Sequence, residues 1–329
     1  MDRVYFLQDE ERLKKICLSI FGDFYSKNSV VLIKIHFGEP GNQTALFPKD
    51  VDPVIKALKD LGIKPTFIDT PVVYPSPRNN VQGYSKVVKD RGYDRLAPFI
   101  ISDQSIDVKT KDFTAKVCKE LIEAKNVLVI SHVKGHPCAG FGGAIKNFGM
   151  GGVMKETKSL EHTFSKPRLT GQCQSCDLCT QLCPFQAIKM VNQKPQIDLN
   201  TCAGCSICEI NCPKQCLTPK KALFDDLLAQ GASAVIKNLS KKTYYLNIIK
   251  NITKMCDCFS NAGEIVAEDI GFLFSDNPVA IDQASLDLIN QKNNNKNLFK
   301  EIHHKDPYLQ IKFASKYLGK KTDYQLQKI

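Results

Sequence analysis

The chain has 329 residues, a formal net charge of +11, 14 cysteines and no tryptophan. This length suits two domains, or one domain with an insertion, and the apolar (43%) and charged (24%) fractions are those of a soluble globular protein. The first residues lack the apolar stretch of a signal peptide, and no segment is apolar over the roughly 18 residues that a membrane helix needs. We therefore expect a cytoplasmic protein without a membrane partner.

The positive charge comes from lysines that are spread along the chain. Lysine accounts for 39 of the 45 basic residues and arginine for 6. Recognition of bases and phosphates favours the arginine fork, and the sequence contains no basic recognition motif. A solvated lysine surface explains the charge better, so we expect no nucleic-acid partner.

In chain order, strands alternate with helices in the first part of the sequence. Residues 30–37, 65–70 and 126–133 have the continuous apolar pattern of strands that are buried on both faces. Helices are expected at residues 52–62, where an Asp-Pro pair marks the start, and at residues 115–125. This alternation is typical of α/β folds.

Eight of the 14 cysteines fall in two blocks with the spacing C-x2-C-x2-C-x3-C-P, namely "CQSCDLCTQLCP" and "CAGCSICEINCP". Three thiolates on one tight loop can converge on three irons of a [4Fe–4S] cluster. The fourth thiolate lies farther along the chain and ligates the other cluster. The predicted ligands are therefore Cys173, Cys176, Cys179 and Cys212 for cluster one, and Cys202, Cys205, Cys208 and Cys183 for cluster two.

The segment with both blocks, residues 167–219, resembles a bacterial two-cluster ferredoxin. Two zinc sites would instead need cysteines in pairs, and the lack of a signal peptide favours metal ligation in a reducing compartment over disulfides. Cys216 follows the complete second block and is expected to be a spare, partly buried thiol. The segment is nearly neutral, so it lacks the strong charge that would steer a free electron carrier to its partners.

The alternation of strands and helices resumes after this segment. Residues 220–231 and 279–289 read as helices, and residues 244–252 and 269–275 read as strands. We predict an α/β fold with a mostly parallel sheet and flanking helices, interrupted by a small α+β ferredoxin-like insert. The predicted parts are residues 1–166 for the first part of the α/β domain, residues 167–219 for the insert, and residues 220–329 for the part that completes the sheet.

Titratable and metal-competent side chains follow the predicted strands. In open α/β sheets, ligands bind beyond the carboxyl ends of the strands, so these side chains predict a site at one edge of the sheet. They are His36 and Glu39 at the end of the first strand, His132 and His136 at the end of the third, Cys256 and Cys258 after the fourth, and Asp276 after the fifth. The two cysteines of "CDC" can face one side of a strand and meet a metal or a substrate, but two buried thiols are the alternative.

Residues 130–152 read "ISHVKGHPCAGFGGAIKNFGMGG" and combine glycines with histidines and lysines. Ile145 and Asn147 do not fit a Walker A loop. Successive backbone N–H groups of a glycine turn can still hold a carboxylate or a phosphate, with added charge from a lysine. The candidates are Gly140, Gly142 and Gly143 for the turn, and Lys134 or Lys146 for the charge. In the alternative, the glycines make only tight turns and His132 is a hydrogen-bonded core residue.

Three stretches resemble the family known as domain of unknown function 362 with a ferredoxin insert: "SHVKGHPCAGFGGAIKNFGMG", "CDCF" and "DIGFLFSDNPVAIDQASLDLI". The resemblance covers nearly the whole chain and implies the fold and the clusters, but the family's name assigns no reaction. A local resemblance links His136, "AGFGG" and Lys146 to the nickel-pincer lactate racemases, in which such a Lys carries the nickel cofactor. "AIK" departs from the Arg that precedes this Lys in the racemases, so the resemblance implies a site but not that cofactor.

These features predict a redox enzyme. Two [4Fe–4S] clusters would relay single electrons between an electron donor or acceptor, either a protein or a small redox molecule, and an unknown small-molecule substrate or cofactor at the predicted site. The candidate catalytic residues are His136, Lys146, His132 and His36. The alternatives are a non-catalytic electron-transfer or scaffold protein, and a racemase-like enzyme whose clusters are structural.

Overall fold

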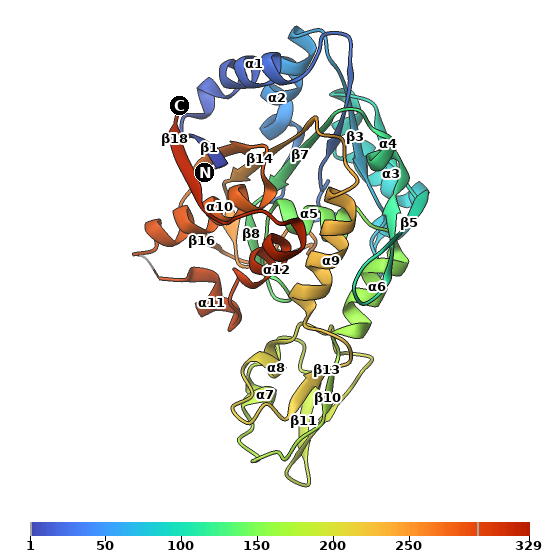
Figure 1. Ribbon diagram of the computed structural model, residues 1–329, viewed down its shortest axis with the longest axis vertical. Coiled ribbons are helices and arrows are strands. Elements are labelled where there is room, and N and C mark those ends of the chain that lie inside the picture. The colour runs from blue at the N-terminus through green and yellow to red at the C-terminus, as the bar shows by residue number, and fades with distance from the viewer. Residues whose placement is uncertain (1, 295) are drawn as a thin grey trace.

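One eight-stranded sheet forms the centre of the larger lobe of the computed structural model, which describes residues 2–294 and 296–329 (Figure 1). Across the sheet, the strands are Tyr324–Lys328 (β18), Asp2–Leu7 (β1), Gly271–Ser275 (β17), Thr243–Ile249 (β14), Val127–His132 (β7), Val30–Lys34 (β2), Lys64–Asp69 (β3) and Phe99–Ile101 (β4). Neighbouring strands are parallel, except that β17 runs antiparallel to both β1 and β14. The predicted α/β fold with a mostly parallel sheet is confirmed.

Helices cover both faces of this sheet. One face packs against Leu13–Phe24 (α1), Pro48–Asp60 (α2) and Val81–Asp90 (α3), and the other against Ala144–Gly151 (α5), Phe224–Ile236 (α9), Pro278–Lys292 (α10) and Leu309–Leu318 (α12). Side chains of β7 alternate between the two cores, with Leu128 and Ile130 in the first and Val127 and Val129 in the second. Burial on both faces explains the continuous apolar pattern of the strands.

Short hairpins and helices connect these elements. They are Ser105–Lys109 (β5) with Thr114–Cys118 (β6), Lys134–His136 (β8) with Gly140–Gly142 (β9), Ile252–Thr253 (β15) with Ile265–Ala267 (β16), and the helices Lys119–Glu123 (α4), Lys155–Phe164 (α6) and Leu298–His303 (α11). Within the described residues, no helix is both long enough and apolar enough to span a bilayer.

Two predicted helices differ from the structure. Helix α2 begins four residues before Asp52, because Pro48 occupies its first turn and the Asp50 carboxylate accepts a hydrogen bond from the Phe47 N–H at 2.7 Å. The predicted helix at residues 115–125 is half strand. Its first half belongs to β6, in which alternate side chains are buried and the backbone pairs with β5, so the period of two decides the local structure there.

Residues 167–219 form a smaller lobe, which we call the cysteine-rich lobe and which projects from the body at the bottom of Figure 1. Its elements are Pro167–Leu169 (β10) paired with Leu217–Pro219 (β13), Ile188–Val191 (β11) paired with Lys194–Ile197 (β12), and the one-turn helices Leu178–Gln181 (α7) and Ile207–Ile210 (α8). Strands β10 and β13 pair where the chain enters and leaves the lobe, while β14, β17 and β18, from the last third of the chain, join the main sheet.

Candidate functional site

A pocket of about 480 Å³, partly open to solvent, lies where β2 and β7 end and α5 begins. We call it the edge pocket, and its lining includes Lys34, His36, His132, Lys146, Asn147 and Cys256. Its position beyond the carboxyl ends of parallel strands is where α/β sheets bind ligands. Three of the candidate catalytic residues, His36, His132 and Lys146, therefore meet in one pocket, and Gly142 and Gly143 line it too.

Two ion pairs support the wall of this pocket. The Lys34 Nζ lies 2.9 Å from the Asp69 carboxylate, and both side chains are buried. The Arg78 guanidinium pairs with Glu39 at 2.5 Å and lies 2.7 Å from the His36 Nε2. Burial, and next the charge of Arg78, lower the pKa of His36 well below its usual value, so this ring is neutral.

Asp257 organises the opposite side of the pocket. Its carboxylate lies 2.8 Å from the His132 Nδ1 and 2.9 Å from the Lys134 Nζ. Burial alone would raise the pKa of Asp257, but His132 and then Lys134 hold it well below its usual value. The other nitrogen of His132 lies 2.7 Å from the Lys250 carbonyl, so this ring is held on both sides, as the core alternative expects.

Lys146 is the lysine of the edge pocket that has no carboxylate partner within the described part of the chain, since Lys34 is paired with Asp69. Its Nζ lies 3.9 Å from the Cys256 Sγ. Burial lowers the pKa of Lys146 to about 8. An ammonium without a fixed counter-charge can hold an anionic group and can also release a proton near neutral pH.

The first two amide donors of α5, directly after the glycine turn, are taken up by a carboxylate. The Asp282 carboxylate, from α10, accepts hydrogen bonds from the N–H groups of Ala144 at 2.7 Å and Ile145 at 2.9 Å. A Cβ at Gly143 would lie 2.4 Å from that carboxylate, so only glycine allows this approach. Gly140 lies elsewhere, against Pro307. Asp282 therefore occupies the first amide donors of α5, directly after the predicted glycine turn.

His136 lies next to the edge pocket, beside the cysteines of "CDC". One donor atom from each of His136, Cys256 and Cys258 lies within 4.8 Å of the others, close enough for one soft metal ion. The two sulfur atoms are joined as a disulfide. The His136 Nδ1 accepts hydrogen bonds from the Cys138 and Ala139 N–H groups at 3.1 and 3.2 Å. Burial, and next Lys146, lower the pKa of His136 well below its usual value.

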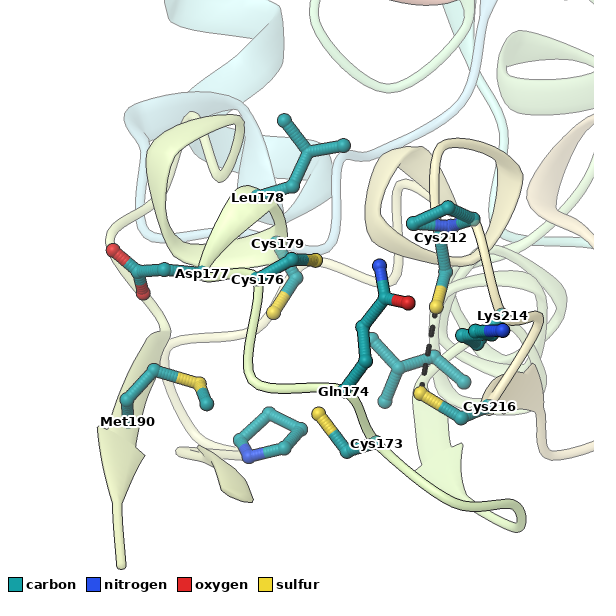
Figure 2. Close-up of a pocket in the computed structure, with 13 residues that line it drawn as sticks. Cys173, Gln174, Cys176, Asp177, Leu178, Cys179, Met190, Cys212, Lys214 and Cys216 are labelled. Atoms are coloured by element: carbon teal, nitrogen blue, oxygen red, sulfur yellow. Dashed lines mark hydrogen bonds between the residues drawn. The ribbon is translucent and has the colours of Figure 1, made fainter. Parts of the chain in front are cut away.

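The cysteine-rich lobe contains a second candidate site. Cys212 belongs to the second cysteine block of the sequence, but it lies with three cysteines of the first block around a pocket of about 350 Å³ (Figure 2). We call this group the first cysteine set: Cys173, Cys176, Cys179 and Cys212. Cys216 lines the same pocket, and its sulfur lies 3.4 Å from that of Cys212. Cys216 is 3% exposed, which is more buried than expected.

The remaining four cysteines surround a pocket of about 300 Å³ and form the second cysteine set: Cys183, Cys202, Cys205 and Cys208. In both sets, backbone N–H groups point at sulfur, from Ser175 to the Cys173 Sγ at 3.3 Å and from Gly204 to the Cys202 Sγ at 3.4 Å. Thiolates of iron–sulfur centres accept such hydrogen bonds. Each of the two pockets is therefore lined by four cysteine sulfurs that could ligate a metal centre.

Left-handed backbone conformations recur at matching positions of the two loops. Ser175 and Asp177 have φ of 58° and 60°, and Gly204 and Ser206 have φ of 64° and 63°. These residues turn each loop around its pocket. A one-turn helix follows in both halves, α7 in the first and α8 in the second. The internal repeat of the sequence is therefore also a repeat of local structure.

A buried ion pair joins the second cysteine set to the body. The Lys305 Nζ lies 2.6 Å from the Asp225 carboxylate, and both side chains are fully buried. The same ammonium donates hydrogen bonds to the backbone carbonyls of Cys205, at 2.7 Å, and Cys138. Cys205 is only 7% exposed, whereas Cys176 of the first set lies exposed. The second cysteine set therefore contacts the body, whereas part of the first cysteine set is exposed to solvent.

Sequence reasoning placed Asp276 in the site, and this prediction is wrong. Strand β17 runs antiparallel to β14, so its carboxyl end lies at the opposite edge of the sheet, where Ser275 pairs with Tyr245. It also missed Arg78, which is fully buried and contacts His36 of the edge pocket. Arg78 carries no local signal, because its partner Glu39 lies 39 residues away in the chain.

One protein family and several solved structures are similar to this chain. The family model described as Domain of unknown function (DUF362) matches residues 31–287. A structure of a protein from Thermotoga maritima is similar with a TM-score of 0.43 and 11% identity, covering 73% of this chain and 50% of that one. The lactate racemase apoprotein from Thermoanaerobacterium thermosaccharolyticum is similar with a TM-score of 0.36 and 14% identity, covering 76% and 51%. The chain thus spans about half the length of these two proteins. No curated protein matches it.

Proposed function

The chain belongs to the family described as domain of unknown function 362, and from this premise we propose that it is an iron–sulfur oxidoreductase. Residues 167–219 would form a ferredoxin-like domain with two [4Fe–4S] clusters, inserted into an α/β domain made of residues 1–166 and 220–329. The clusters would exchange single electrons with an outside protein or small redox molecule and serve the edge pocket. The observation that carries this proposal is that the eight cysteines divide into two sets of four around two pockets.

The two cysteine sets differ in exposure, and this difference supports an order in which electrons would pass through them. Cys176 of the first set is exposed, which suits contact with an outside redox partner. Cys205 and Cys208 of the second set are buried, and Cys205 contacts the body through Lys305. In this proposal the first cysteine set faces the partner and the second faces the α/β domain. Such clusters suit a reducing compartment, so we place the protein in the cytoplasm.

At the edge pocket, the chain's own residues would bind a small anionic molecule and supply a proton. Lys146 is the candidate anchor, because the other lysine of the pocket, Lys34, is already neutralised by Asp69. With its pKa near 8, Lys146 can also donate a proton at neutral pH. The neutral ring of His36 accepts a hydrogen bond from Arg78 at its Nε2, and its lowered pKa makes it a poor proton acceptor.

Metal analysis of protein purified without air tests the proposal. Two four-iron clusters give about eight iron and eight sulfide per chain, together with the electron paramagnetic resonance signals of reduced clusters. Zinc in place of iron, or less than about one iron per chain after attempted reconstitution, would contradict the proposal.

Cys212 and Cys216 provide a matched pair of variants, because both line the first pocket and their sulfurs lie 3.4 Å apart. Cys212→Ala removes a proposed ligand and should lower the iron content to about half, since one cluster of four irons is lost. Cys216→Ala should keep the full content. If Cys216→Ala loses iron and Cys212→Ala does not, the assignment of ligands to the first cysteine set is wrong.

A further inference from the structure

We propose that Cys256 and Cys258 form a redox-active disulfide that accepts electrons at the edge pocket, an inference that rests on the function proposed above. In the structure the two sulfurs are joined, with the Cα atoms 5.4 Å apart. Cys256 lines the edge pocket, and Cys258 is partly exposed. Disulfides in reducing compartments are usually catalytic or redox-sensing rather than structural.

The loop that carries the disulfide is fixed by the residue between the two cysteines. The Asp257 side chain reaches His132 and Lys134, and its backbone carbonyl accepts a hydrogen bond from the Glu39 N–H at 2.8 Å. The loop is therefore anchored whether or not the two sulfurs are bonded. A site that must open and close its S–S bond without unfolding needs such an anchor.

Polar groups around the sulfurs suit a thiolate. The Lys146 Nζ lies 3.9 Å from the Cys256 Sγ, and the Cys258 N–H donates to the same sulfur at 3.3 Å. A nearby cation and N–H donors make a thiol reactive. Cys17, by contrast, packs in the apolar core, where burial raises the pKa of its thiol. The cysteine pair therefore lies beside the ammonium of Lys146, whereas the thiol of Cys17 lies in the apolar core.

The ring of His136 favours a disulfide over a metal site. Its Nδ1 already accepts two backbone N–H groups, from Cys138 and Ala139. A neutral imidazole in this arrangement carries its proton on Nε2, so Nε2 has no lone pair for a metal. The Nε2–H group can instead donate a hydrogen bond, and one nitrogen of this ring lies within 4.8 Å of both sulfurs.

A chain of direct contacts connects the disulfide to the second cysteine set. Lys305 donates to the carbonyls of Cys205 and Cys138, the Cys138 N–H donates to His136, and His136 lies beside the two sulfurs. These links join segments that are far apart in sequence, since Lys305 and Cys205 are separated by 100 positions. The proposed clusters and the disulfide are therefore connected through packed protein.

The chemistry balances with reduced iron–sulfur clusters as the reductant. Reduction breaks the S–S bond, consumes two electrons and two protons, and yields two thiols. When bound, the clusters would supply these electrons one at a time and would themselves be oxidised. The Lys146 ammonium supplies one proton to the Cys256 sulfur and regains it from solvent, and the second proton comes from solvent that enters the partly open edge pocket.

The test equilibrates the protein, purified without air, in buffers with different ratios of oxidised to reduced dithiothreitol. Free thiols are then blocked with N-ethylmaleimide and quantified by peptide mass spectrometry. We expect Cys256 and Cys258 to change together and reversibly between unlabelled and doubly labelled forms, while labelling of Cys17 does not change. Lys146→Met should slow labelling of the reduced pair several-fold, and Lys146→Arg should restore most of the rate.

Three results would overturn the inference: a pair that stays oxidised at every ratio, a pair that is labelled at every ratio, or a stoichiometric metal that must be removed before labelling. A second measurement separates this inference from the relay. Reduced methyl viologen should reduce the pair in the wild-type protein faster than in Cys212→Ala, which lacks the first cluster. If dithiothreitol reduces the pair reversibly but viologen shows no such difference, the disulfide is redox-active and the proposed electron relay is wrong.

Discussion

Lys305 and Cys205 meet at the junction between the cysteine-rich lobe and the body, where the buried Lys305 ammonium donates to the Cys205 carbonyl at 2.7 Å. The charge is balanced by Asp225, 2.6 Å away and equally buried. An ionised group with no access to water is costly unless it is paired and hydrogen-bonded. This junction therefore fixes the second cysteine set against the α/β body.

Replacement of Lys305 should destabilise the protein strongly. Lys305→Met leaves the buried Asp225 carboxylate without a partner, and the expected loss in the free energy of unfolding is about 3–5 kcal/mol. Lys312→Met is the matched control, because its ion pair with Asp306 is mostly exposed and should contribute at most about 1 kcal/mol. Chemical denaturation without air, followed by circular dichroism, measures both. Equal losses in the two variants would show that the junction does not depend on this ion pair.

Lys146 should titrate far below the surface lysines. Burial lowers its pKa to about 8, so about half of its amine is neutral at pH 8, and binding of an anion that depends on the ammonium should weaken as the pH rises through 8. Competitive labelling with acetic anhydride between pH 6 and pH 11, with mass spectrometry of peptides, gives the pKa of each lysine. Lys56, whose side chain is 60% exposed, serves as the surface reference. A Lys146 that titrates together with Lys56 would remove it as a proton donor at neutral pH.

Glu161 should make the protein less stable as the pH rises. It is fully buried in α6, its carboxylate has no hydrogen-bond partner among the described residues, and burial raises its pKa well above the usual value. The folded state therefore retains a proton that the unfolded state releases above about pH 4.3, so stability falls with pH until the folded pKa is reached. The largest possible slope is about 1.4 kcal/mol per pH unit.

Glu161→Gln removes this titration. The free energy of unfolding of the variant, relative to that of the wild-type protein, should therefore rise from pH 6 to pH 8. Denaturation curves at both pH values give the difference, and Glu156→Gln, an exposed position of the same helix, is the control. A difference between Glu161→Gln and wild type that stays constant with pH would show that Glu161 is already ionised in the folded protein.

Features that depend on local spacing could be predicted without the structure. The C-x2-C-x2-C-x3-C-P repeat predicted which four cysteines belong together, and the structure gathers the same sets around two pockets. Continuous apolar runs located β2, β3, β7 and β14, because strands buried on both faces need apolar residues at every position. The histidines His36 and His132 reached one pocket because parallel strands align their carboxyl ends.

The partners of the buried charges could be identified only in the folded chain. Arg78 pairs with Glu39, and Asp282 occupies the amides at the start of α5, 138 residues away along the chain. The direction of β17, which places Asp276 at the other edge of the sheet, could not be predicted either. An apolar run has the same pattern in either direction. Charge pairing and strand direction are contacts between distant segments, and their energy appears only once the chain has brought those segments together.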